Sequence, residues 1–198
     1  MPDAETLAAY ALRADDYADR FAKGRPDRHL EAFIAALPAS ARILDLGCGP
    51  GRAASRMMRE GFEVDAWDAS PEMARVALDR FGIDVRIATF DDLDATAVYD
   101  GIWANFSLLH APRAEMPVHL ARISRALKPG GFFHLGLKTG TGEARDSLGR
   151  FYTFYGEDEL DGLLADAGFT VLDRTTGAEK GLGGTTDPFI ILRARRND

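Results

Sequence analysis

The chain has 198 residues, enough for one well-packed domain and too few for two. Its net charge of −7 disfavours a nucleic-acid partner, and its 46% hydrophobic and 28% charged residues are ordinary for a globular protein. The single cysteine, Cys48, excludes an internal disulfide and a cysteine-built metal site. The sequence shows neither a signal-peptide pattern nor a membrane-spanning apolar run, so we expect a cytoplasmic protein with no membrane partner.

Hydrophobic periodicity and turn signals predict the elements in chain order. Two helices come first, at residues 4–22 and 30–37, and the second ends at Pro38. Strands then alternate with helices, the strands at 42–47, 62–68, 84–90, 99–107 and 131–138 and the helices at 51–61, 70–81 and 113–127. A glycine-rich, charged loop follows at 139–150, and an aromatic cluster at 151–155. The chain ends with a predicted helix at 157–167 and two strands at 169–176 and 188–195.

This order of elements predicts the fold class. Strand and helix alternate five times, which is typical of an α/β, Rossmann-like, doubly wound sheet of about seven strands, most of them parallel. The last two strands have no helix between them, so we expect an antiparallel C-terminal hairpin. In such sheets ligands bind beyond the carboxyl ends of the strands.

Three alternating glycines, Gly47, Gly49 and Gly51, directly follow the first predicted strand in "ILDLGCGPGR". Glycines let the chain turn sharply and let a ligand lie against main-chain atoms. The dinucleotide pattern GxGxxG requires its third glycine at position 52, where the chain has Arg52. The loop therefore argues against a nicotinamide-dependent oxidoreductase, which we keep as an alternative.

Two carboxylates flank this loop in the sequence. Asp45 lies two residues before the first glycine and suits a cationic group such as the ammonium of an amino acid. Asp68 ends the second predicted strand, where an acid accepts the hydroxyls of a ribose. Together they indicate a nucleoside that carries an amino-acid-like cation, a description that S-adenosylmethionine fits.

From about Tyr10 onward the chain resembles the class I S-adenosylmethionine-dependent methyltransferases, in "ILDLGCGPG", "VDAWDASPEM", "YDGIWANFSLLH" and "LARISRALKPGGFFHL". The resemblance implies one methyltransferase domain over residues 1–198, in which residues 1–38 form a helical lid on a Rossmann-like core at 39–198. It also implies methyl transfer to an O, N or S atom of a small molecule, with S-adenosylhomocysteine as product. A module that binds the cofactor without catalysis is a further alternative.

The resemblance also implies where the cofactor binds. The positions that it places at the cofactor are Tyr10, Tyr17, Asp45, Gly47, Cys48, Gly49, Asp68, Ala69, Phe90, Asp91 and Asn105. In "FDDL" either Asp91 or Asp92 meets the adenine amine. Cys48, between two glycines, is most simply a small packed thiol. No metal site is expected, because the sulfonium needs alignment more than covalent help.

The acceptor side is less well defined by the sequence. His110 ends the fourth strand region, either as a general base for the acceptor or as an anchor of its loop. Lys138, Arg145 and Arg150 follow the fifth strand and suit an anionic acceptor, although charges in such loops are usually solvated. The stretch "NFSLLH" lacks the proline pair typical of enzymes that methylate exocyclic nitrogen, which further disfavours a nucleic-acid acceptor.

Overall fold

A mixed seven-stranded sheet forms the centre of the computed structural model, which describes residues 2–22 and 27–198, the side chains of residues 20–22 excepted. The strand order is β3-β2-β1-β4-β5-β9-β8. The bounds are β1 Arg42–Leu46, β2 Glu63–Asp68, β3 Val85–Ile87, β4 Tyr99–Asn105, β5 Leu127–Lys138, β8 Phe169–Lys180 and β9 Thr186–Arg196. The first five strands pair in parallel and β9 is antiparallel to β5 and β8, which confirms the predicted sheet and its C-terminal hairpin.

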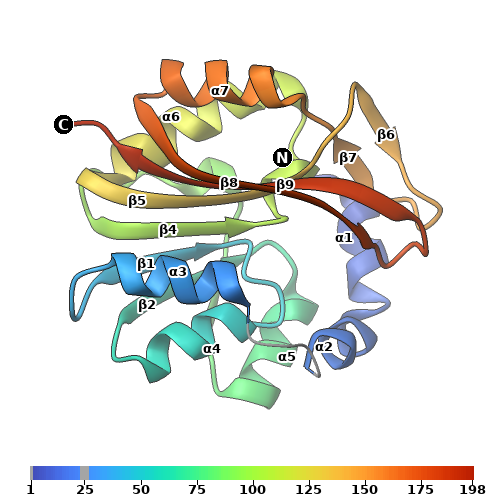
Figure 1. Cartoon of the computed structure of the whole chain (residues 1–198). Helices are drawn as coiled ribbons and strands as arrows, with labels where there is room; N and C mark the ends of the chain where they lie inside the picture. Colours follow the sequence, from blue (N-terminus) through green and yellow to red (C-terminus); the bar gives the residue numbers. More distant parts are fainter. Residues whose placement is uncertain (1, 23–26) are drawn as a thin grey trace.

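Helices cover both faces of this sheet (Figure 1). One buried cluster joins α6 and α7 to the sheet around Phe133, and a second joins α3 and α4 to it through Phe33, Met57 and Trp103. Burial of these apolar side chains is the main force that holds the layers together. The helices on the two faces are α3 Arg28–Ala36, α4 Arg52–Arg59 and α5 Pro71–Phe81 on one side, and α6 Met116–Ala126 and α7 Glu157–Asp166 on the other.

The prediction of one helix over residues 4–22 is wrong, because the chain turns after α1 (Ala4–Ala11) and starts again as α2 (Ala14–Ala22). The buried alanines of α2 pack against α5, and this tertiary contact overrides the helical propensity of the segment. The turn places the rings of Tyr10 and Tyr17 edge to face, with centroids 5.7 Å apart. The two tyrosines therefore meet across two helices and not along one.

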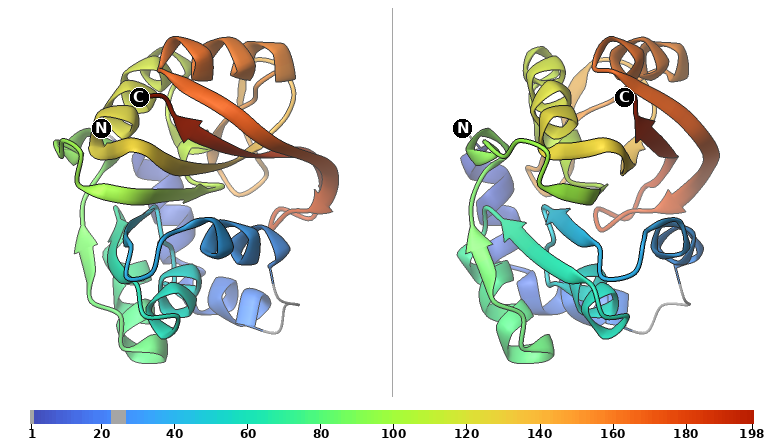
Figure 2. Two further views of the ribbon diagram at one scale, coloured as in Figure 1. Left: turned by 60° about the vertical axis from the view of Figure 1, so that its left-hand side comes forward. Right: turned by 90° about the vertical axis from the view of Figure 1, so that its left-hand side faces the viewer.

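The segment predicted as a loop at 139–150 contains a strand. β6 (Glu143–Arg145) pairs antiparallel with β7 (Phe151–Thr153) in a separate two-stranded sheet. In Figure 1 this small hairpin, α1 and α2 lie beyond the carboxyl ends of the parallel strands. Figure 2 shows the longer β8–β9 hairpin curling away from the plane of the sheet. These segments surround the edge of the sheet where ligands bind in α/β folds.

Smaller differences concern element ends. The helix predicted from residue 113 begins as a 3-10 turn at Arg113–Glu115, and β5 starts at Leu127, so that it includes the "KPGG" segment. The start of α5 is as predicted: Ser70 Oγ accepts from the backbone N of Met73 at 3.2 Å, which caps the helix ahead of its proline. Within the described residues, no helix is both long and apolar enough to cross a membrane.

Candidate functional site

A cavity of about 910 Å³ lies at the carboxyl ends of the parallel strands. Its walls come from α1, the glycine loop, the ends of β2, β4 and β5, and β9. Among the residues selected from the sequence, Gly51, Asp92 and Arg145 lie outside the lining. The cavity is lined by all the others, namely Tyr10, Tyr17, Asp45, Gly47, Cys48, Gly49, Asp68, Ala69, Phe90, Asp91, Asn105, His110, Lys138 and Arg150.

Left-handed backbone angles explain the glycines of the loop after β1. Gly47, Gly49 and Gly51 have φ values of 77°, 53° and 77°, where side chains are strained. A Cβ on Gly47 would lie 2.3 Å from the Cβ of Ser107, and one on Gly51 would lie 3.0 Å from the Cβ of Ala77. Beyond its chain neighbours, a Cβ on Gly49 would meet no atom of the described residues closer than the Cε1 atom of Tyr17, at 4.0 Å. Packing thus requires the outer two glycines, and the middle one leaves its main chain open to the cavity.

Asp68 holds this loop in place from the end of β2. Its Oδ2 accepts from the backbone N of Gly49 at 2.7 Å, and its Oδ1 accepts from the backbone N of Ser70 at 2.9 Å. Burial raises the pKa of the carboxyl, and these backbone donors oppose that shift. One side chain therefore ties the glycine loop to the start of α5 and also lines the cavity.

Asp45, at the carboxyl end of β1, is a buried carboxylate with an unused oxygen. Its side chain is 2% exposed, and its Oδ2 has no hydrogen-bond partner in the described part of the chain. Burial and, to a smaller extent, the nearby Asp68 raise its pKa to about 7, against one backbone hydrogen bond from Ala54. A buried carboxylate is costly unless it is paired. The arrangement therefore suits a ligand that brings a cationic donor to Oδ2.

Cys48 lies in the same loop, and its thiol is buried among small side chains of α4, β2 and α5. Burial raises its pKa well above the usual value, and the carboxylates of Asp45 and Asp68 add to this shift. A thiol becomes a nucleophile only as the thiolate. The structure therefore makes Cys48 a neutral wall residue of the cavity.

The two adjacent acids after β3 have different positions. Asp92 Oδ2 accepts from the N and Oγ1 of Thr89, at 2.7 and 2.8 Å, and so caps a 3-10 turn at Phe90–Asp92. Asp91 lines the cavity beside Phe90, and its Oδ1 lies 3.2 Å from Arg122 Nη1. Only Asp91 of the two acids reaches the cavity, because Asp92 is used by its own backbone.

A buried histidine that the sequence did not single out orients Asn105 at the end of β4. Asn105 Oδ1 lies 3.0 Å from His134 Nε2, and because an amide oxygen only accepts, the imidazole donates. His134 also stacks on Trp103, with ring centroids 3.5 Å apart. Burial holds the pKa of His134 well below its usual value, so the ring is neutral. The oxygen of the amide is therefore occupied, and its NH₂ remains to donate.

His110 belongs to a hydrogen-bond chain whose direction is fixed. Its Nδ1 lies 2.6 Å from the carbonyl oxygen of Phe151, which only accepts, so Nδ1 carries the proton. Its Nε2 then accepts from the hydroxyl of Tyr10 at 2.9 Å, and the oxygen of Tyr10 accepts from Arg150 Nη1 at 3.1 Å. Burial lowers the pKa of His110 to about 4. The ring is thus neutral near pH 7, with its basic nitrogen bound to Tyr10.

We predict that Tyr10→Phe lowers the free energy of unfolding by about 1–3 kcal/mol, because the partly buried His110 and the buried Arg150 lose their shared partner. Tyr155→Phe is the control, since the hydroxyl of Tyr155 is buried without a partner within the described residues and its removal costs little. Chemical denaturation measures both changes. Nitrogen-15 NMR of the histidines tests the chain itself: the wild type should show His110 protonated at Nδ1, and protonation at Nε2 would contradict this assignment.

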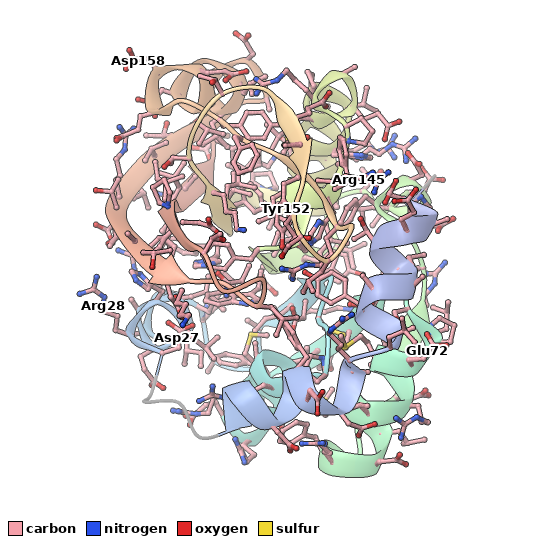
Figure 3. The ribbon with its side chains drawn as sticks, turned by 90° about the vertical axis from the view of Figure 1, so that its right-hand side faces the viewer. Asp27, Arg28, Glu72, Arg145, Tyr152 and Asp158 are labelled. Atoms are coloured by element: carbon pink, nitrogen blue, oxygen red, sulfur yellow. The ribbon has the colours of Figure 1, made fainter. Side chains whose placement is uncertain are left out.

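The three cations selected from the sequence each face a carboxylate. Lys138 Nζ lies 2.6 Å from Asp187 Oδ2, and Arg150 Nη2 lies 2.6 Å from Asp146 Oδ2. Arg145 is bound to Asp3, which precedes α1, with Nη2 2.7 Å from Oδ2. Figure 3 shows Arg145 close to α1, whereas Tyr152 lies nearer the centre of this side of the molecule. Lys138 and Arg150 reach the cavity with their charges already matched.

The N-terminal helices are tied to the rest of the chain at two places. The backbone N of Phe151 donates to Thr6 Oγ1 at 2.8 Å, which joins α1 to the β6–β7 hairpin. Arg75 Nη2 lies 2.8 Å from Asp15 Oδ2, which joins α2 to α5. The hydroxyl of Tyr10 adds the bond to His110. The two helices therefore close one side of the cavity.

The described residues contain no group of three His, Cys, Asp or Glu side chains that could hold a metal ion.

Comparison with known proteins relates the central segment to one family. Residues 43–131 match the family model described as a methyltransferase domain. The chain is 35% identical over 100 residues to a ubiquinone biosynthesis O-methyltransferase of Xanthomonas oryzae, covering 47% of this chain and 41% of the relative. It is 35% identical over 118 residues to a trans-aconitate 2-methyltransferase of Mycolicibacterium gilvum, covering 59% and 44%. The chain thus spans about two fifths of the length of these curated relatives.

Solved structures are similar over more of the chain. A 1,6-didemethyltoxoflavin-N1-methyltransferase of Burkholderia thailandensis, with bound 1,6-didemethyltoxoflavin and S-adenosylhomocysteine, is 27% identical with a TM-score of 0.68. The match covers 100% of this chain and 93% of that one. A methyltransferase of Methanosarcina mazei has a TM-score of 0.75 at 18% identity, over 86% of this chain and 98% of that one. The second likeness concerns the fold alone.

Proposed function

We propose that the chain is a class I S-adenosylmethionine-dependent methyltransferase, which transfers the methyl group of S-adenosylmethionine to an O, N or S atom of a small molecule and releases S-adenosylhomocysteine. One observation carries this proposal: the unused, buried oxygen of Asp45 lies in the cavity wall next to the open turn at Gly49 and to Asp68. A cationic amino acid joined to a ribose matches all three features.

The proposed contacts follow the walls of the cavity. Asp45 would accept from the ammonium group, with the main chain of the glycine loop and Cys48 beside the methionine part. Asp68 would accept from the ribose hydroxyls, Ala69 and Phe90 would flank the adenine, and Asp91 would meet its amine. Tyr10, Tyr17 and the NH₂ group of Asn105 would bound the reacting end.

The cofactor supplies, when bound, a methyl group on a positively charged sulfur. The protein then contributes alignment of the acceptor and exclusion of water. We propose that residues 1–38 serve as a lid on the core at 39–198, since α1 and α2 line the cavity and are bound to the hairpin and to α5. His110 is the proposed proton acceptor, reached through the hydroxyl of Tyr10, which already donates to Nε2.

The proposed acceptor is a small molecule and not a nucleic acid, in keeping with the net charge of −7 and with relatives that act in ubiquinone biosynthesis and on trans-aconitate. We also propose a cytoplasmic location, because a single buried cysteine is typical of proteins that need no disulfide framework. An oxidoreductase gains no support from these relatives.

Thermal unfolding with S-adenosylhomocysteine tests the cofactor part of the proposal. At a hundredfold excess over its dissociation constant, a ligand of the folded state stabilises by about 2.7 kcal/mol, or roughly 5–10 °C in a chain of this size. NAD is the control and is expected to cause no shift. Stabilisation by NAD alone would instead support the oxidoreductase. Transfer of a labelled methyl group to hydroxylated, amine, thiol and carboxylate metabolites then tests catalysis, and cofactor binding without any transfer would favour the non-catalytic module.

A further inference from the structure

Phe106 directly follows β4 and adopts a backbone conformation that bulky residues avoid. Its φ is +57°, in the left-handed region. Its backbone N donates to the carbonyl oxygen of Gly136 at 2.9 Å, which fixes this conformation against β5. The side chain lines the cavity. Ser40 and Ala97 also have positive φ, but of these three non-glycine residues in the described part of the chain only Phe106 lines the cavity. Strained backbone tends to cluster at binding and active sites, which makes Phe106 a candidate binding residue.

The ring of Phe106 continues into an apolar wall. It lies edge to face with Phe189 of β9, with centroids 6.0 Å apart at 84°. Ile191, two residues further along β9, lines the cavity as well. Alternate residues of a strand point to the same face. This wall therefore offers two aromatic rings and an aliphatic side chain to whatever occupies this end of the cavity.

A second group of rings lines the same end from the β6–β7 hairpin, α1 and the 3-10 turn that contains His110. The centroids of His110 and Tyr152 are 4.8 Å apart, and those of Tyr10 and His110 are 5.4 Å apart. The polar atoms of Tyr10 and His110 bind one another and neighbouring groups, as described above. Because these polar atoms are already hydrogen-bonded, this group offers a ligand mainly the surfaces of its rings.

Charges at this end of the cavity are balanced. Lys138 is paired with Asp187 and Arg150 with Asp146, each at 2.6 Å. Both cations also face the ring of Tyr152, with Lys138 Nζ 3.8 Å from its centroid. A carboxylate ligand would have to displace one of these partly buried carboxylates, which is costly when it leaves a charge unpaired. Because these charges are already paired, this end of the cavity favours an uncharged ligand.

We propose that the methyl acceptor is an uncharged, planar aromatic or heteroaromatic compound that stacks against these rings. This inference rests on the proposed function, since it assigns this end of the cavity to the acceptor. Rings prefer offset or edge-to-face contacts with other rings, which the Phe106–Phe189 pair and the Tyr152 group both offer. It replaces the expectation, drawn from the three cations in the sequence, that the acceptor is anionic.

Calorimetry on the full chain loaded with S-adenosylhomocysteine tests this class without requiring turnover. The probes are matched fragment sets: flat uncharged hydroxyquinolines and aminopyrimidines, the same rings with a carboxylate added, their saturated analogues, and aliphatic dicarboxylates and tricarboxylates. We expect the best ligands in the first set, with carboxylated partners at least about tenfold weaker. Tightest binding by any other set, or no binding by the first, would overturn the proposal.

Variants connect the binding to this wall. Phe106→Leu and Phe189→Leu are each expected to weaken the best flat ligand by about tenfold or more and to change S-adenosylhomocysteine affinity less than about twofold. Phe81→Leu, at the end of α5 and outside the lining, is the matched control with no effect on either ligand. Unchanged affinity for the flat ligand in both cavity variants would place it elsewhere and refute the proposal.

Phe106→Asn separates strain from packing, because asparagine tolerates the left-handed region. We expect it to lose the flat ligand while its melting temperature falls much less than that of Phe133→Leu in the buried core. An equal fall would mean that Phe106 serves packing alone. If S-adenosylhomocysteine does not bind at all, the proposed function fails; the fragment sets without it then still show whether the aromatic wall takes flat ligands.

Discussion

Asp45→Asn is expected to stabilise the ligand-free protein at pH 8 by about 2–4 kcal/mol, the upper figure being the full cost of the pKa shift and the lower one allowing for the buried amide that replaces the carboxylate. The same variant should weaken the binding of S-adenosylhomocysteine at least about a hundredfold. The wild-type side chain buries a charge with one oxygen unpartnered among the described residues, and asparagine removes the charge but keeps an oxygen for the backbone N of Ala54. The same change removes the carboxylate that we propose for the ammonium group. Stability and binding should therefore move in opposite directions, as they do where a site is built against stability.

The pH dependence gives this prediction its sign. The pKa of Asp45 is raised from 3.8 to about 7 in the folded state, so between these values the folded carboxyl keeps a proton that the unfolded one has lost. The cost of burying the charge is absent near pH 4, grows as the pH rises and is complete above pH 7. The gain from Asp45→Asn should accordingly be small at pH 4.5 and largest at pH 8.

The comparison must be made between variant and wild type at each pH, because His110 contributes with the opposite sign. Its pKa is lowered from 6.5 to about 4, so its contribution to stability is lost as the pH falls through this range. Chemical denaturation at each pH measures the gain, and Asp94→Asn, at an exposed ion pair with Arg125, is the control with little expected effect. A variant that is less stable than wild type at pH 8, or that still binds the ligand fully, would contradict the role given to Asp45.

The parts of the fold that were predictable from the sequence are those set by local patterns. The β1 strand, the glycine loop and the Ser70-capped start of α5 each have their signal within a few consecutive residues, and the structure has them where they were predicted. The break between α1 and α2 has no such signal, since it depends on packing against α5. The β6–β7 hairpin was missed because its strands have three residues each and its first strand is exposed.

The same distinction holds for the cavity. Asp45 and Asp68 were found because they flank recognisable strand ends, and the structure brings both to one wall. Two of the carboxylates that neutralise the cations were not, because their distance in sequence carries no pattern: Asp187 lies 49 residues from Lys138, and Asp3 lies 142 residues from Arg145. The positive φ of Phe106 is likewise a property of the folded backbone and has no mark in the sequence.

Asp68→Ala is expected to abolish thermal stabilisation by S-adenosylhomocysteine, with affinity reduced at least about a hundredfold. Two effects combine. The variant loses the proposed acceptor for the ribose hydroxyls, and it also leaves the backbone N–H groups of Gly49 and Ser70 without the carboxylate that holds them. The open turn at Gly49 then loses its anchor to β2, so the second effect should lower affinity even for ligands that lack a ribose.

A control with the same kind of backbone contact distinguishes loss of the site from general loss of stability. Asp100 accepts from the backbone N of Arg42 at 2.9 Å and from Lys128, but at the amino end of β4, away from the cavity. Asp100→Ala should therefore lower the melting temperature and keep the full shift caused by S-adenosylhomocysteine. Methionine, which has the ammonium group but no ribose, separates the two effects of Asp68→Ala: if the anchoring of the turn matters, its weak binding to the wild type also disappears in the variant. A full ligand-induced shift in Asp68→Ala would remove Asp68 from the site, whatever its place in the loop.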